Sequence, residues 1–300
     1  MAKFIKKHFK TMILYLVLLI GLCLLLYPTV SDWWNSFHQT RAIASYVEAV
    51  DSMDSEDLEA LLEEARRYNG RLAVQGARFQ LTEEEEAEYE SLLDVSGTGV
   101  MGYVQIPKIN VSLPVYHGTD EAILQIATGH IPGSSLPVGG DNTHSVISGH
   151  RGLPSAKLLT DLDQIQEGDI FTVTVLNQTV TYEVDQIRIV APDDVSDLQI
   201  IPGEDHCTLV TCTPYGINTH RLLVRGRRTE NITEGVAADA EAVKVPLYIA
   251  LPVEGIPVVF VMMVIFVISR RFGKSSKTEG ELMEELKVLA EKEGGDVHEE

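Results

Sequence analysis

Two long apolar runs interrupt an otherwise mixed pattern of hydrophobic and polar positions. The first, Thr11–Val30, has twenty residues without a charge, and the second, Val245–Ile268, has twenty-four with Glu254 as its only charge. A helix that crosses a membrane needs about 20 apolar residues. The pattern therefore predicts two membrane-spanning helices, with Trp33 and Trp34 as interfacial aromatic residues beyond the first. It argues against a simple cytosolic enzyme.

Helical periodicity follows the first apolar run. Over residues 40–66 the apolar positions recur at three- and four-residue steps, which predicts a helix, and Ser55-Glu-Asp within it resembles a helix start. Thr82 and Glu85 have the spacing of a capping box, so a second helix is predicted over Thr82–Leu93. The four glutamates at 83–86 suit its solvated first turn, where the helix dipole favours negative charge.

From residue 100 the pattern changes to short β-branched runs separated by turn signals. These runs are YVQIP (103–107), SVIS (145–148), IFTVTV (170–175), VTYEVDQIRIV (180–190), TLVT (208–211) and RLLVRGRR (221–228). The segment LNQT (176–179) is expected to form a tight hairpin turn. Helical pieces are expected to be brief, around Glu121–Thr128 and Leu158–Gln166. Many short strands with frequent turns predict a mainly β domain, a barrel or a sandwich of about 130 residues.

Charge gives an orientation to the two predicted spans. The chain has a net charge of −20, yet four lysines precede the first run, and basic residues follow the second: Arg270, Arg271, Lys274 and Lys277. Basic flanks favour the cytoplasmic side, so both termini are expected there and the middle of the chain outside. The strongly acidic middle would repel phosphates, which argues against nucleic acid as a partner.

Two alternatives remain open for these runs. Thr11–Val30 could be a cleaved signal peptide, although it is long for one and no Ala-x-Ala site follows it. Three prolines crowd the first half of the second run: Pro246, Pro252 and Pro257. That run is therefore either a kinked helix or a segment that lies partly at the interface.

An exported domain with an unpaired cysteine invites a nucleophile hypothesis. Of the three cysteines, Cys23 lies in the first apolar run, which leaves Cys207 and Cys212 in the exported region. Cys212 ends the predicted strand TLVTC and precedes a loop. His150 follows another predicted strand, and Arg221 begins the strand after the loop, so that Cys212 and Arg221 would lie side by side. A cation stabilises a thiolate, a histidine can protonate a leaving amine, and an arginine can bind an oxyanion.

Each of these residues also has a simpler interpretation. A cysteine in a strand is usually buried and inert, which is the interpretation we favour for Cys207, and His150 or Arg221 could be ordinary surface residues. Three other histidines could replace His150 as the acid: His130, His144 and His220. Four residues could be read as a zinc set: His206, Cys207, Cys212 and His220. The spacing of five between the two cysteines argues against zinc, because it points them to opposite faces of a strand.

At the candidate residues the sequence resembles the sortases. TLVTC with an arginine nine residues after its cysteine resembles their signature, and ISGH at 147–150 resembles their histidine motif. The similarity extends over 98–228 and is strongest to class C, the pilin-polymerising sortases of Gram-positive bacteria. The resemblance implies a mainly β fold: a sortase-type eight-stranded β-barrel with short helices, preceded by a helical membrane-proximal segment and flanked by two transmembrane helices.

The resemblance also implies the activity of a cysteine transpeptidase. Cys212 would attack the Thr carbonyl of a Leu-Pro-x-Thr-Gly-type sorting signal, His150 would protonate the departing Gly amine, and Arg221 would bind the oxyanion or position the substrate. A lysine amine of the next pilin subunit would then resolve the thioester. No cofactor or metal is implied. The expected partners are pilin precursors and the lipid bilayer.

Two other functions remain open at this point. The protein could be a sortase that attaches surface proteins to the amine of the cell-wall precursor. It could also be a catalytically silent membrane scaffold with a sortase-like barrel. Intact Cys212, His150 and Arg221 argue against the scaffold.

The expected organisation places the catalytic barrel outside a cell membrane that the chain crosses twice. Its segments are a cytoplasmic N-terminus (1–10), a transmembrane anchor (11–30), an extracellular helical or lid region (31–97), the sortase barrel (98–228), a linker (229–244), a second transmembrane segment (245–268) and an acidic cytoplasmic tail (269–300). Class C sortases often carry a lid with an Asp-Pro-aromatic motif. The matching segment, 68–95, has no Asp-Pro, and Phe79 is the candidate aromatic residue of a lid.

Overall fold

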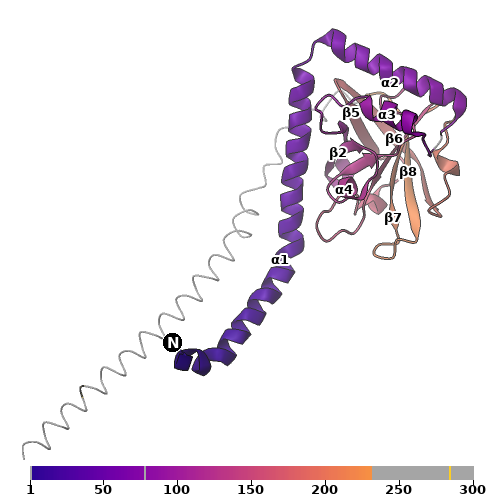
Figure 1. Ribbon diagram of the computed structural model, residues 1–300. Helices are drawn as coiled ribbons and strands as arrows, with labels where there is room; N and C mark the ends of the chain where they lie inside the picture. Colours follow the sequence, from indigo (N-terminus) through magenta and orange to yellow (C-terminus); the bar gives the residue numbers. More distant parts are fainter. Residues whose placement is uncertain (1, 78, 232–283, 285–300) are drawn as a thin grey trace, which may run out of the picture. The chain divides into compact units, whose positions relative to one another are not determined.

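The computed structural model describes residues 2–77, 79–231 and 284. Eight strands form a closed barrel in the order β1-β2-β3-β4-β7-β8-β6-β5 (Figure 1). Their bounds are β1 Val100–Ile106, β2 Val111–His117, β3 Thr128–His130, β4 Thr143–Gly149, β5 Ile170–Val175, β6 Gln178–Val190, β7 Asp205–Thr213 and β8 His220–Arg228. The predicted mainly β, eight-stranded barrel is confirmed. The second predicted span, 245–268, lies outside the described residues.

Alternation along the strands separates the inside of the barrel from its outer face. On β7 the side chains of Cys207 and Leu209 are fully buried in the main core, while Val210 belongs to a second, smaller apolar cluster. Side chains two residues apart share a face of a strand, so Cys212 lies on the same outer face as Val210. The predicted position of Cys207 in the core is confirmed.

Two kinds of strand pairing place the loops that matter for the site. β7 pairs with β8 as an antiparallel hairpin, and β4 pairs with β7 in parallel. The carboxyl ends of β4 and β7 and the amino end of β8 therefore meet at one end of the barrel. The predicted hairpin between β5 and β6 is confirmed, with Val175 paired to Gln178 across a two-residue turn. Strands β2 and β3 were not predicted from the pattern.

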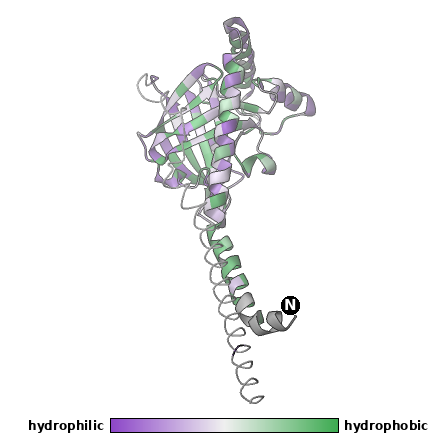
Figure 2. Ribbon diagram, turned by 90° about the vertical axis from the view of Figure 1, so that its left-hand side faces the viewer, coloured by the Kyte–Doolittle hydropathy of each residue, from purple (hydrophilic) through white to green (hydrophobic). Residues whose placement is uncertain are grey.

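The N-terminal helix is longer than its apolar run. Helix α1 spans Ala2–Asp51 and contains the whole predicted span 11–30, with Pro28 inside it. Among the described residues, one helix is long and apolar enough to cross a membrane, and its apolar window is not buried against protein. Figure 2 shows hydrophobic residues concentrated along this part of α1. An apolar helix of this kind suggests a membrane anchor.

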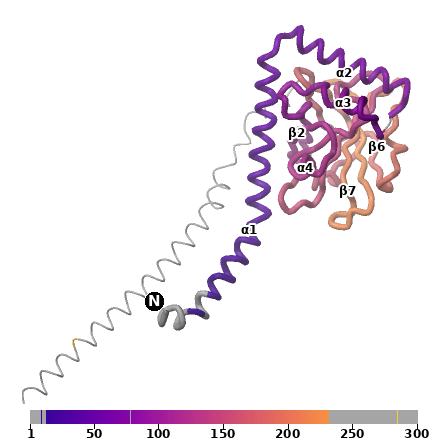
Figure 3. Tube along the Cα trace, viewed as in Figure 1, coloured from indigo at the N-terminus to yellow at the C-terminus, as the bar shows by residue number. Residues whose placement is uncertain are grey.

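The helical structure predicted over 40–66 is confirmed, but it is divided between two helices, and the second begins at Ser55, where the sequence resembles a helix start. Helix α1 ends at Asp51, and α2 begins at Ser55 and runs to Gln75 (Figure 3). Asp54 at the N-cap of α2 has an extended backbone, which ends the helical path. Apolar periodicity continues across the break because both helices pack on the same core, through residues such as Tyr46 and Leu62.

Short helices complete the fold. Helix α3 spans Glu83–Ser91 and begins with the predicted capping box, in which Thr82 and Glu85 exchange hydrogen bonds. Helix α4 covers Glu121–Leu124. Three 3-10 turns follow β1, precede β5 and precede β7: η1 Pro107–Ile109, η2 Leu162–Gln164 and η3 Ser196–Leu198. The helical pieces predicted around 121–128 and 158–166 are therefore present in shortened form.

Candidate active site

Cys212 and Arg221 lie directly opposite each other in neighbouring strands. The antiparallel register of β7 and β8 pairs Cys212 with Arg221, and the next pair, Thr213 with His220, ends the hairpin. Cys212 is half-buried, and so is Arg221. The loop of six residues between the strands returns the chain in register, which is why the nine-residue spacing in the sequence becomes a cross-strand contact.

His150 lies next to Cys212 on the other side, at the end of β4. The residues flanking the cysteine are bonded to the residues flanking the histidine. Thr211 Oγ1 donates a hydrogen bond to the Gly149 carbonyl at 2.8 Å, and Arg151 Nη1 donates one to Thr213 Oγ1 at 3.4 Å. The parallel register of β4 and β7 extends to Ser148 and Val210, two residues before His150 and Cys212. The structure thus brings together all three residues that the sequence singled out, with Cys212 between the other two.

The guanidinium of Arg221 is held at one end. Its Nη1 donates to the carbonyl oxygens of His220, at 3.1 Å, and Asn218, at 3.4 Å. Within residues 2–77 and 79–231 no hydrogen bond or ion pair engages its Nε or Nη2. An arginine keeps its charge at any physiological pH and can donate several hydrogen bonds in one plane. The arrangement leaves donors for an anionic oxygen close to the thiol.

His150 is held by contacts on both its backbone and its ring. Its carbonyl accepts a hydrogen bond from Leu159 N at 3.2 Å, and its Nε2 lies 3.5 Å from Glu121 Oε2. The Gln125 side chain, and to a smaller extent His150, hold the pKa of the Glu121 carboxyl below its usual range. Glu121 is largely exposed, so this contact is screened by water and restrains the ring only weakly.

Sequence reasoning missed Arg151 and Tyr215, which join the loop after β4 to the loop after β7. The Arg151 side chain is only 8% exposed; it pairs with Asp163, donates to the Thr160 carbonyl at 3.1 Å, and lies over the Tyr215 ring at 5.8 Å. Gly152 has a φ of +76°, and a β-carbon there would come within 2.9 Å of the Tyr215 ring. The arginine between His150 and Gly152 was the available signal, but Tyr215 lies 64 positions away in the sequence.

An apolar cluster covers the outer face of the barrel beside the site. Its buried members are Val146, Leu198, Val210 and Leu223, with Phe79, Ile131 and Val190 packed against them. Val210 precedes Cys212 by two residues and Leu223 follows Arg221 by two, so the cluster and the site share one face. We call this group the outer-face cluster. Phe79 therefore packs on the face that also carries Cys212, and its role in a lid stays a prediction.

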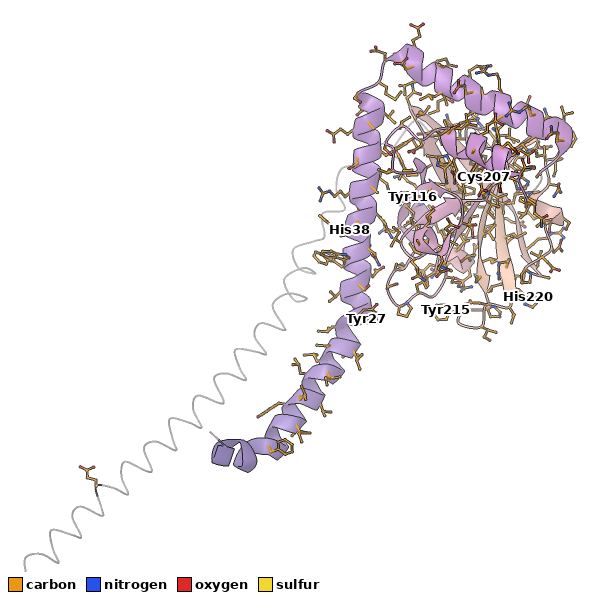
Figure 4. All side chains as sticks on the ribbon, viewed as in Figure 1. Tyr27, His38, Tyr116, Cys207, Tyr215 and His220 are labelled. Atoms are coloured by element: carbon orange, nitrogen blue, oxygen red, sulfur yellow. The ribbon has the colours of Figure 1, made fainter. Side chains whose placement is uncertain are left out.

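The alternative acids are less suited to chemistry than His150. His130 and His144 are fully buried, and burial lowers the pKa of each ring to about 4. His130 accepts or donates within a closed set of bonds to Tyr89, Ser134 and Ser135, so it serves packing. His220 pairs with Thr213, the residue after Cys212, but its side chain is exposed (Figure 4). Its Nδ1 lies 3.0 Å from Thr219 Oγ1.

The zinc set does not assemble around one point. Cys207 faces the core and Cys212 faces outward, while His206 and His220 lie near opposite ends of the β7–β8 hairpin. Among the described residues no group of three ligands is placed to hold a metal. Burial raises the pKa of the Cys207 thiol well above its usual range, which makes Cys207 a poor ligand and a poor nucleophile.

Fold and site define a closed mixed β-barrel with a strand-end thiol flanked by a histidine and an arginine. The family model described as "Sortase domain" matches residues 104–229. The crystal structure of sortase C1 from Streptococcus agalactiae is 55% identical, with a TM-score of 0.63, over 64% of this chain and 100% of that chain. Sortase C from Clostridium perfringens, solved with a C-terminal cell wall sorting motif, is 41% identical, with a TM-score of 0.56, over 64% of this chain and 99% of that chain.

Curated relatives give the same family with a broader range of names. Sortase D of Bacillus subtilis is 31% identical over 42% of this chain, and sortase A of Streptococcus agalactiae is 29% identical over 48%. The matches span 63% and 59% of the length of these two relatives. The chain belongs to the sortase family.

Proposed function

We propose that this protein is a membrane-anchored cysteine transpeptidase of class C, which polymerises pilins. The observation that carries the proposal is the position of Cys212 between His150 and Arg221 across two neighbouring strands. Class C is favoured because the similar solved structures at 55% and 41% identity are named sortase C. The curated relatives are named sortase A and sortase D, so the class itself is part of the proposal.

The proposed acylation step begins with the Cys212 thiolate. Its sulfur attacks the Thr carbonyl carbon of a Leu-Pro-x-Thr-Gly-type signal, and the carbonyl oxygen becomes an oxyanion. Arg221 stabilises this oxyanion or the nearby substrate backbone, since its free donors lie beside the thiol. The tetrahedral intermediate then collapses: the C–N bond to Gly breaks, His150 gives its proton to the departing amine, and a thioester remains on Cys212.

The second step forms an amide bond. A neutral lysine amine of the next pilin attacks the thioester carbonyl, loses a proton to His150, and releases the Cys212 sulfur. The product is an isopeptide bond, and His150 ends in the protonation state in which it started. These steps balance in atoms and charge without a cofactor.

Membrane anchoring fits this reaction. Helix α1 contains the apolar run 11–30, and the basic flanks favour a barrel on the outer side of the membrane, where the proposed pilin substrates would be assembled. The two-pass arrangement stays a prediction, because its second span lies outside the described residues.

A competition between amines tests the class. The full-length protein receives a sorting-signal peptide together with two acceptors: a pilin domain bearing its acceptor lysine and the amine-bearing stem peptide of a cell-wall precursor. The proposal predicts that the lysine isopeptide dominates the products. Predominant transfer to the stem peptide would instead assign the protein to the attachment of surface proteins. Binding of the sorting-signal peptide without any reaction at Cys212 would support the scaffold.

A further inference from the structure

The end of the barrel that carries Cys212 is bonded to the residues that follow the apolar run of α1. Asp32 Oδ1 accepts a hydrogen bond from Lys157 N at 2.6 Å, and Asn35 Nδ2 donates one to the Ser155 carbonyl at 2.7 Å. Ser155 and Lys157 belong to the loop that follows His150. Farther along α1, Gln39 Nε2 donates to the Ile126 carbonyl at 2.7 Å.

The geometry of helix α1 gives the depth of these hydrogen bonds relative to the bilayer. An α-helix rises 1.5 Å per residue, so Asp32 and Asn35 lie about 3 Å and about 8 Å beyond Val30 along the axis. The headgroup layer on each side of a bilayer is about 5–7 Å thick. The loop that holds Ser155 and Lys157 is therefore fixed at the level of the lipid headgroups if 11–30 spans the hydrocarbon core.

The β7–β8 loop lies at the same depth, because it packs against the loop that holds Ser155 and Lys157. Tyr215 packs on Gly152 and Arg151, which precede Ser155 in the adjoining loop. Two large side chains of the β7–β8 loop point into solvent: Tyr215 is 59% exposed and Ile217 is 67% exposed. Figure 4 labels Tyr215 and His220, the first residue of β8, at this end of the barrel.

Charge and composition suit a lipid surface better than open water. The chain carries a net charge of −20, yet the segment from Cys212 to His220 contains no acidic residue. Two acidic side chains of the loop that follows His150 are paired, Asp161 with Lys157 and Asp163 with Arg151. Exposed aromatic residues of α1 lie just past the span as well: Trp34 is 56% exposed and Phe37 is 53% exposed. Tyrosine and tryptophan are enriched where membrane meets water.

We infer that the β7–β8 loop inserts Tyr215 and Ile217 into the headgroup layer of the bilayer that anchors the chain. The inference rests on the proposed anchor. Its consequence is that the site works at the membrane surface, because Cys212 is three residues from Tyr215 and so within about 10 Å of it. A peptide cleaved here must present its scissile bond close to the lipid, as it does when the bond lies just outside a membrane-embedded segment.

A depth measurement on the full-length protein tests this inference. The variant Ile217→Cys is made in a background with Cys23→Ser and Cys212→Ala and is labelled with an environment-sensitive fluorophore. Cys207 is fully buried, so it is not expected to take the label. The labelled protein is placed in phosphatidylcholine–phosphatidylglycerol vesicles whose lipids carry nitroxide headgroups. The matched control is Val74→Cys, because Val74 is an 88% exposed aliphatic residue on α2.

The control lies far from the site. Arg66 of α2 contacts Gln178 at the start of β6, and the other end of β6, Val190, pairs with Arg221. Figure 1 shows α2 across the end of the barrel opposite the β7–β8 loop. Since β6 is about 40 Å long and nitroxides quench over a shorter range, quenching at position 217 should exceed that at 74 by about tenfold or more.

Two results would overturn the inference, and they separate it from the anchor. If the protein stays in the vesicles after a carbonate wash, yet both positions show equal and weak quenching, the anchor is retained and only the inferred membrane contact of the β7–β8 loop is contradicted. Protein that the wash removes contradicts the anchor and, with it, the inference.

A kinetic measurement separates lipid contact from substrate contact. Ile217→Asp should lower turnover of a vesicle-anchored sorting-signal peptide by about tenfold, the expected effect of losing one buried aliphatic side chain, and leave turnover of a soluble peptide unchanged. Val74→Asp should change neither. An equal fall for both peptides in Ile217→Asp would place Ile217 in substrate binding and contradict the inference.

Discussion

Cys212 and Arg221 face each other across the β7–β8 hairpin, one pair before the strands end. Directly opposed residues in an antiparallel pair have α-carbons about 5 Å apart. This pairing fixes a permanent cation beside a half-buried thiol. The position does not depend on any flexible segment, because both residues are held by the strand register.

Replacement of Arg221 by lysine tests whether the guanidinium acts on the reaction. Lysine keeps the charge but loses the planar set of donors, so Arg221→Lys should lower the rate of thioester formation by about 10²–10³, as for loss of an oxyanion donor. The measurement is single-turnover acylation of Cys212, accompanied by the melting temperature.

The matched control for Arg221 is Arg227→Lys. Arg227 shares the outer face of β8, is 60% exposed in its side chain and has one ion pair, with Glu204. Arg225 is unsuitable because it makes a bidentate pair with Asp185, at 3.0 and 2.7 Å, and its replacement would also disturb folding. Similar acylation rates in Arg221→Lys and Arg227→Lys would show that the cation beside the thiol has another role.

Phe79 is expected to restrict access to the site. It packs against the outer-face cluster, whose members Val210 and Leu223 lie two residues from Cys212 and Arg221. Phe79 lies outside the strands, so Phe79→Ala removes this contact and leaves the strand residues unchanged. The closed position of the segment should lose about 1 kcal/mol of stability, so alkylation of Cys212 by a small thiol reagent should become about three- to tenfold faster. Leu81→Ala, in the same segment but packed on the main core, is the control. Unchanged alkylation in Phe79→Ala would contradict a lid anchored by Phe79.

Stability should fall on acidification because of His130. Burial lowers the pKa of this ring to about 4 in the folded protein, whereas an unfolded histidine titrates near 6.5. Between these values the unfolded chain binds a proton that the folded chain does not, so stability decreases as the pH falls from 6.5 to 4. One such histidine accounts for about 3 kcal/mol.

Denaturant unfolding at pH 7 and pH 4, on full-length protein in detergent, measures this dependence. His130→Gln should start from a lower stability at pH 7 and lose about 3 kcal/mol less than the parent chain on acidification. Carboxylates contribute to both proteins alike, so the difference between them isolates the histidine. An equal loss in the two proteins would remove His130 as the cause.

The residues of the site could be predicted from the sequence more completely than the fold around them. The nine residues from Cys212 to Arg221 span a hairpin whose strand ends are legible in the sequence, so their pairing follows from local pattern. The proximity of His150 follows from the parallel pairing of β4 with β7, which joins segments about sixty residues apart; the sequence reached it by resemblance to a family and not from spacing.

Other features depend on contacts that a linear pattern does not encode. Strand β2 contains Pro114, and β3 has three residues, so neither gave a recognisable alternation. The helix start at Ser55 was legible in the sequence, but the end of α1 at Asp51 was not, because the apolar period continues through the break. Arg151 and Tyr215 are 64 positions apart, and their contact appears only when the two loops meet.

The most direct test is to locate the acyl group after reaction with a Leu-Pro-x-Thr-Gly-type peptide. Full-length protein is mixed with the peptide, quenched in acid, digested and analysed by mass spectrometry. We expect a hydroxylamine-sensitive acyl-Thr adduct on the fragment bearing Cys212, retained in Cys207→Ala and absent in Cys212→Ala. An adduct on Cys207, or cleavage of the peptide by Cys212→Ala at the parent rate, would contradict it.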